Sequence, residues 1–231
     1  ALMLISTVVN GQRLVFSAVE KLPLAINTDA EEIAPFLSPD GMTLYFTRLL
    51  DPANRGGKFA GSDVYMSRYD VTTLNWKAPE NLMSINTKGN NILIGLNSKG
   101  DQLYTLATSA NKVPLGFYVS KRVNGVLGKP ELVPISKLQS DGFIGAYLTP
   151  DQDVLIVSME REDSRGEEDL YISVKSGNAW SSLVNMGSSI NTKGFEIAPF
   201  LSADKKRLFF SSNGHPGSGS ADIFYCDRLY N

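Results

Sequence analysis

The chain has 231 residues, of which 42% are hydrophobic and 20% are charged, and 22 basic side chains nearly balance 24 acidic ones. This composition is too apolar for a disordered protein and ordinary for a globular one. A net charge of −2 gives no basic field that would recruit phosphate, so we expect no nucleic-acid partner. Every apolar stretch is far shorter than the roughly 20 residues that a bilayer span needs, so we expect no membrane span.

Metal and cofactor chemistry has little support in the residue types present. One cysteine, Cys226, and one histidine, His215, cannot form an intrachain disulfide or a Cys/His zinc site. We therefore expect no cofactor. Weak calcium binding is the alternative for two acidic clusters, which are otherwise solvated loops. These clusters are Asp29, Glu31 and Glu32, and Glu160, Glu162, Asp163, Glu167 and Glu168.

Internal repetition is the main signal in the sequence. Residues 26–40 and 190–204 are nearly the same string, and weaker copies begin at Ile85 and Ile135. Each copy leads into a polar turn, a short apolar run, a variable loop and an apolar-aromatic triplet. The triplets begin at Asp63, Gly116, Asp169 and Asp222, which is a constant step of 53 residues.

Each repeat is expected to contain four short strands. In the first repeat they cover about 33–38, 43–48, 63–68 and 76–82, where β-branched and aromatic residues are bounded by Pro, Gly, Asp and Asn. A four-stranded unit that recurs every 40–55 residues is typical of a β-propeller blade. The four repeats cover about 29–83, 88–135, 140–189 and 193–229.

The two ends of the chain predict how the ring closes. The last repeat stops after its third strand, and residues 14–25 match the outer strand that precedes residue 190. We expect this N-terminal strand to complete the last blade, which would leave no bare sheet edge. The fold class is therefore all-β, a single domain over 1–231 with four blades of four antiparallel strands. A fragment of a larger ring is the competing interpretation.

The repeat resembles the TolB-type, WD-like β-propeller family of bacterial envelope proteins. The residues that carry the resemblance are Ser38-Pro39-Asp40-Gly41-Met42-Thr43-Leu44-Tyr45-Phe46, Gly61-Ser62-Asp63-Val64-Tyr65, and Trp76 followed by Pro79-Glu80-Asn81-Leu82 and Ile85-Asn86-Thr87. The second copy departs most, with Gly95 and Asn97 where others carry Phe and Ser. The resemblance implies a propeller in the periplasm or outside the cell; it implies little about function, because propellers host both binding and catalysis.

Most recurring polar residues have a structural explanation. Asp40, Asp151 and Asp204 lie in tight turns, where a carboxylate accepts bonds from nearby backbone N–H groups. The triplet aspartates are expected to bind loop amides between blades. The Asn of each Ile-Asn-Thr string is expected to cap a turn in the same manner.

The start of each first strand is the candidate binding site, because in a propeller these strands line the central axis. Two carboxylates, amides and an aromatic ring around one channel mouth could bind a cation, a sugar or a basic peptide. The candidate residues are Glu31, Glu32, Asn90, Asn91, Asp141, Phe143 and Glu196. No catalytic residues and no metal ligands are assigned.

Two functions from different classes remain open. The first is a non-catalytic binding and scaffold propeller of the cell envelope, expected to be a monomer, that presents loops and a channel mouth to an envelope protein or a cell-wall glycan. The second is a carbohydrate-active enzyme that uses Glu32 and Glu196 as its two carboxylates.

Overall fold

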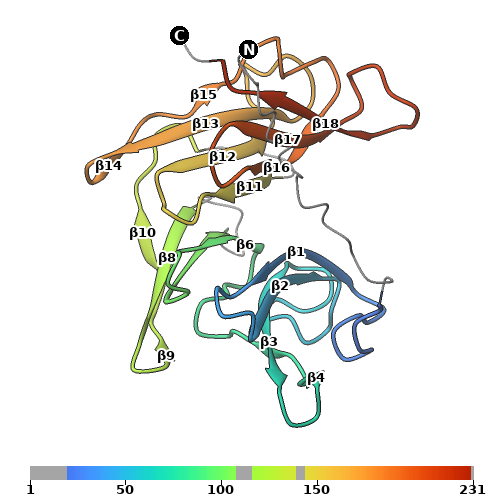
Figure 1. The fold of residues 1–231 in the computed structure, drawn as a ribbon, viewed down its shortest axis with the longest axis vertical. Helices are drawn as coiled ribbons and strands as arrows, with labels where there is room; N and C mark the ends of the chain where they lie inside the picture. The colour runs from blue at the N-terminus through green and yellow to red at the C-terminus, as the bar shows by residue number, and fades with distance from the viewer. Residues whose placement is uncertain (1–19, 108–115, 139–143, 230–231) are drawn as a thin grey trace, which may run out of the picture.

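The computed structural model describes residues 20–107, 116–138 and 144–229, which form eighteen strands. Figure 1 shows four small antiparallel sheets that follow one another in chain order. Their innermost strands line one central channel. The fold is a four-bladed β-propeller, as the repeats predict. Within these residues, no helix occurs that is long and apolar enough to cross a membrane.

Each of the first three sheets has three long strands and two short outer ones. The first contains β1 (Glu31–Leu37), β2 (Thr43–Leu49), β3 (Asp63–Asp70), β4 (Asn75–Trp76) and β5 (Glu80–Asn81). The second contains β6 (Asn91–Leu96), β7 (Gln102–Ala107), β8 (Gly116–Val123), β9 (Val126–Leu127) and β10 (Glu131–Val133). The third contains β11 (Ile144–Leu148), β12 (Val154–Met159), β13 (Asp169–Ser176), β14 (Ala179–Trp180) and β15 (Val184–Asn185). The fourth contains β16 (Glu196–Leu201), β17 (Arg207–Ser212) and β18 (Asp222–Asp227).

The third strand of each sheet begins where the repeat spacing predicts. β3, β8, β13 and β18 start at the four triplet residues, so the predicted spacing of 53 is confirmed. The predicted outer strand over 76–82 is instead two short strands that both pair with β3. Pro79 lies between them and has no N–H to donate, which interrupts the ladder.

The fourth sheet has three described strands, in the order β16-β17-β18. Of the closing strand expected over 14–25, residues 14–19 lie outside the described part of the chain, and residues 20–25 form no strand. The next residue, Ile26, is buried against Phe46 and Tyr65 of the first sheet. The described N-terminal turn is therefore anchored to the first blade.

Most of the hydrophobic core lies in three clusters, one at each junction between consecutive sheets. Leu93 and Leu103 pack on Tyr45 and Val64 between the first two sheets. The largest cluster joins the second and third sheets and includes the fully buried Tyr171. A third joins the third and fourth sheets. Apolar burial between blades, rather than within one sheet, is therefore what holds each blade to the next.

Two inner strands carry the same β-bulge. In β1, Ala34 and Pro35 together face one residue of β2, and in β16, Ala198 and Pro199 do the same against β17. Ala34 and Ala198 have φ angles of 50° and 52°. This left-handed conformation normally suits glycine, and the following proline restricts the residue further. Both strands therefore hold local backbone strain at the channel wall.

Replacing Ala198 by glycine is expected to stabilise the protein. An L-residue in the left-handed region costs about 1–2 kcal/mol, and glycine avoids this cost but loses about 0.5–1 kcal/mol more chain entropy. We expect Ala198→Gly to raise the free energy of unfolding in urea by about 0.5 kcal/mol. Ala146→Gly, in the regular inner strand β11, is the matched control and should lower it by about 0.5–1 kcal/mol. An equal loss in the free energy of unfolding in both variants would contradict backbone strain at Ala198.

Candidate functional site

The three predicted site residues Glu32, Asn91 and Glu196 occupy equivalent positions, and each accepts hydrogen bonds from the threonine four residues earlier. Thr28 N and Oγ1 donate to Glu32 Oε1 at 3.3 and 2.7 Å. The Thr87 N–H donates to Asn91 Oδ1 at 2.8 Å. Thr192 N and Oγ1 donate to Glu196 Oε2 and Oε1 at 2.9 and 2.7 Å. These side chains cap the turn that leads into each inner strand.

The asparagine of each Ile-Asn-Thr string makes a second connection. Asn86 Oδ1 accepts the Val64 N–H at 2.9 Å, and its Nδ2 donates to Val64 O at 3.0 Å. Asn191 makes the same pair of bonds with Leu170, at 2.8 and 3.0 Å. Both asparagines are almost fully buried. These two asparagines therefore bond the backbone of the third strand in the preceding sheet, and not the nearby turn N–H groups that the sequence predicts. Asn27, in the first string, donates instead to Leu22 O at 3.1 Å.

The triplet aspartates complete this junction. Asp63 Oδ2 accepts the Arg55 N–H at 2.6 Å and the Asn81 amide at 2.7 Å. Asp169 Oδ2 accepts the Arg165 N–H at 2.9 Å and the Asn185 amide at 2.6 Å. Asp222 Oδ2 accepts the N–H groups of Ser218 and Gly219 at 2.7 and 3.1 Å. The expected bonding to loop amides is therefore confirmed for all three.

One carboxylate oxygen in these junctions has no partner. Asp169 Oδ1 is buried and accepts no hydrogen bond from the described residues. In the first junction the equivalent oxygen, Asp63 Oδ1, faces the Asn91 amide at 3.4 Å. The third junction has Glu196 in place of that asparagine, and a carboxylate has no N–H to donate. The substitution explains the unpaired oxygen.

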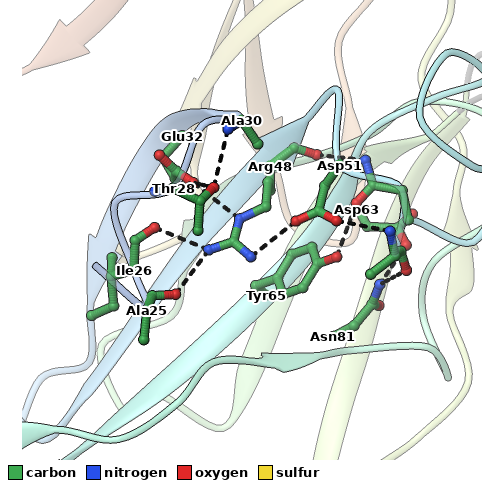
Figure 2. Close-up of polar contacts among 12 residues, drawn as sticks. Ala25, Ile26, Thr28, Ala30, Glu32, Arg48, Asp51, Asp63, Tyr65 and Asn81 are labelled. Atoms are coloured by element: carbon green, nitrogen blue, oxygen red, sulfur yellow. Dashed lines mark hydrogen bonds and ion pairs between the residues drawn. The ribbon is translucent and has the colours of Figure 1, made fainter. Parts of the chain in front are cut away.

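Arg48 organises a buried charge cluster around Glu32. Its guanidinium donates to Glu32 Oε1 and Asp51 Oδ2, both at 3.1 Å, and to the carbonyls of Ala25 and Ile26 at 3.2 and 3.0 Å. Figure 2 shows the guanidinium between the Ala25–Ile26 backbone on one side and Asp51 on the other. Its carbon lies 4.7 Å from the centre of the Tyr65 ring. Arg48 therefore fixes the N-terminal turn to the first sheet.

The remaining predicted residues have different surroundings. Glu31 is exposed and lines the central channel. Asn90 is exposed. Asp141 and Phe143 lie outside the described residues. Of the five candidates that the structure describes, only Glu31 is found on the channel wall, while Glu32, Asn91 and Glu196 cap the turns that lead into the inner strands.

This arrangement bears on the two carboxylates proposed for glycoside hydrolysis. Glu196 is fully buried, and Ser212 Oγ adds a third donor to its carboxylate at 2.8 Å. Glu32 is paired with Arg48 and has 16% of its side chain exposed. A general acid and a nucleophile must both reach a substrate. In the structure these two side chains instead belong to separate hydrogen-bond networks.

Weak calcium binding is the alternative for the two acidic clusters, at residues 29–32 and 160–168. In the described ranges, no group of three or more His, Cys, Asp and Glu side chains is arranged to hold an ion. Asp163 pairs with Arg161 at 3.0 Å and accepts the Tyr171 hydroxyl at 3.1 Å. These partners give that carboxylate a structural role in the loop before β13.

The central channel is a cavity with a volume of about 840 Å³. All four inner strands contribute to its wall. The wall is mainly aliphatic, aromatic and proline side chains, including Phe36, Tyr147, Pro199 and Phe200. Sequence reasoning expected polar groups here and missed the apolar wall, although the repeated Ala-Pro-Phe string at 34–36 and 198–200 was visible.

Comparison with known proteins supports the fold. No protein-family model and no curated protein matches the chain. A solved complex of BT0996 with RGII is 12% identical over 85% of this protein and 70% of that one, with a TM-score of 0.51. The periplasmic gluconolactonase PpgL of Pseudomonas aeruginosa is 15% identical over 85% and 57%, with a TM-score of 0.47. The β-propeller domain of the Trilobed protease from Pyrococcus furiosus is 14% identical over 85% and 55%, with a TM-score of 0.43.

At these identities the likeness is one of fold alone. The chain spans little more than half the length of the gluconolactonase and of the protease propeller. What those proteins act on is therefore not carried over to this chain.

Removing the Arg48 side chain is expected to destabilise the protein strongly. Arg48→Ala would leave Glu32 and Asp51, both mostly buried, without their cation. We expect a loss of about 3 kcal/mol in the free energy of unfolding, measured in urea. Arg207→Ala is the matched control, because Arg207 also pairs with an aspartate and stacks on a tyrosine but is 44% exposed. Its loss should stay below about 1 kcal/mol. Similar losses in the two variants would contradict the anchoring role of Arg48.

Glu196 is expected to be structural. Glu196→Ala removes the carboxylate that accepts three donors, which should lower the free energy of unfolding by about 1–3 kcal/mol. Glu31→Ala removes an exposed carboxylate and should stay within about 0.5 kcal/mol of the parent protein. Chemical denaturation of both variants tests this. An unchanged free energy of unfolding in Glu196→Ala would contradict the structural role.

Proposed function

We propose that this protein is a non-catalytic binding propeller of the bacterial cell envelope, related to the TolB-type propellers, that works in the periplasm or outside the cell. It presents its loops and its channel to a protein or to a cell-wall glycan. The observation that carries the proposal is the separation of polar and apolar side chains around the axis. Polar side chains at the ends of the inner strands are engaged in turns, and the channel between those strands remains apolar.

A rigid frame supports a binding role. Buried apolar clusters at three junctions and the asparagine bridges between sheets hold the inner strands in place. Loops on such a frame keep a fixed geometry, so that little ordering entropy is lost when a partner binds. The envelope location rests on the resemblance of the repeat, above all the Ser38–Phe46 string and the Gly61–Tyr65 string.

Capture of envelope components tests the proposal. Tagged protein is incubated with purified peptidoglycan sacculi and, separately, with solubilised envelope extract, and bound material is quantified over a range of protein concentrations. We expect saturable binding in one of the two. Leu37→Ser, which places a hydroxyl on the channel wall, should weaken it about threefold or more. The matched control Leu132→Ser alters an exposed leucine of β10 and should bind normally.

Two results would contradict the proposal. One is the absence of saturable binding to both materials. The other is release of reducing ends from a glycan substrate that Glu32→Gln and Glu196→Gln each abolish, because such turnover is the mark of a carbohydrate-active enzyme.

A further inference from the structure

The central channel has the size and the wall of a small-molecule site. Its volume of about 840 Å³ lies within the range of ligand pockets. At liquid density this space would hold about 28 water molecules. A mainly apolar wall gives these waters few hydrogen-bond partners, so an apolar ligand that replaces them gains free energy.

Few polar groups on the wall are available to a ligand. The Asn97 amide is engaged, since its Oδ1 accepts the N–H groups of Asp101 and Gln102, both at 3.0 Å. Burial raises the pKa of Tyr147, so its hydroxyl is uncharged at neutral pH. The Glu31 side chain is exposed, and no hydrogen bond or ion pair joins it to another described side chain. Among the described residues that line the wall, Glu31 therefore offers the one available charge, and that charge is negative.

Aromatic rings occupy one level of the channel. Phe36, Tyr147 and Phe200 lie at the same position of their inner strands, opposite Tyr45, Ile156 and Phe209 of the adjoining strands. The fourth residue of this level is Gly95. The rings of Tyr147 and Phe200 are 5.0 Å apart, and Phe200 is still 50% exposed. Gly95 takes part in close packing, because a Cβ there would lie 2.9 Å from Leu148 O.

The bulges hold two of these rings in position. Phe36 and Phe200 each follow an Ala-Pro pair in which alanine has a left-handed backbone and proline has a fixed φ. A ring held this way loses little freedom when a ligand packs on it, which favours binding. The same device in two separate blades places both rings on the wall of one channel.

We propose that the channel binds a small, elongated apolar molecule with an aromatic ring at one end and a cationic group at the other, with the ring against Phe200 and Tyr147 and the cation toward Glu31. Glu31 pairs with Leu49 and Phe36 pairs with Tyr45, so the carboxylate lies about 13 Å along the channel from the level of the rings. This inference names the ligand class for the channel and rests on the binding function proposed above. Aromatic pairs gain affinity beyond their buried area, and an exposed carboxylate adds charge preference.

Two probes with the same ring and opposite charge test the proposal. 6-Phenylhexylamine is a cation at neutral pH, and 7-phenylheptanoate is an anion; the extended chain of each carries the charge toward Glu31 while the ring stays at Phe200. Titration calorimetry at low salt should show saturable binding of the amine, with an affinity about threefold or more above that of the carboxylate probe. Glu31→Gln should remove this preference. Phe200→Ala should weaken amine binding about fivefold. Equal affinities for the two probes, or no saturable binding of the amine, would overturn the proposal.

Tyr225→Ala is the matched control. Tyr225 is a half-exposed aromatic residue on the same sheet that does not line the channel. Its replacement should change amine affinity by less than about twofold. An equal loss in Tyr225→Ala and Phe200→Ala would show that sheet stability, and not the channel, controls binding. The amine could fail to bind while Leu37→Ser still weakens capture of envelope material. That result would overturn the proposed ligand class and leave the proposed binding function supported.

Discussion

The junction between consecutive sheets depends on one buried asparagine side chain. β5 ends at Asn81, and the Leu82 N–H that follows donates the last backbone bond to β3, to the Val64 carbonyl at 3.0 Å. Asn86 completes this edge, because its amide oxygen accepts the Val64 N–H and its amide nitrogen adds a second donor to the Val64 carbonyl. Asn191 does the same at Leu170. A buried backbone group without a partner costs free energy, so this side chain is what allows the polypeptide to leave one sheet and enter the next.

The junction also explains why the channel is apolar. The chain turns from the outer edge of one sheet to the axis within a few residues, and its exposed N–H groups need acceptors. The N–H groups of Thr28, Thr87 and Thr192 are donated to Glu32, Asn91 and Glu196, so these three polar side chains at the start of the inner strands are used in the turns. The strand residues that follow face the axis without such demands. They are free to be aliphatic, aromatic or proline.

Sequence reasoning reached the fold because a propeller repeats its local rules. The 53-residue step located the start of β3, β8, β13 and β18. The side-chain direction at the inner strands was harder to predict. The sequence predicts Glu32 and Glu196 at the channel mouth because they lie at the start of an axial strand. A threonine four residues before each glutamate is, however, a signal that the carboxylate accepts hydrogen bonds within its own turn. The bulges at Ala34 and Ala198 shift the residues that follow, and alternation along a strand cannot predict where such a shift falls.

The junctions share an arrangement of hydrogen bonds but differ in the charge of the side chains at equivalent positions. The first junction contains Asp63 with Asn91, so that the carboxylate faces an amide donor. The third contains Asp169 with Glu196, and one buried oxygen of Asp169 is left without a partner. Burying an unpaired polar atom costs stability, and two acidic side chains in one junction add to that cost. The opposite arrangement occurs in the first blade, where Arg48 neutralises Glu32 and Asp51. Equivalent positions thus differ in how the negative charge is balanced: an amide faces Asp63 in the first junction, and a guanidinium faces Glu32 in the first blade.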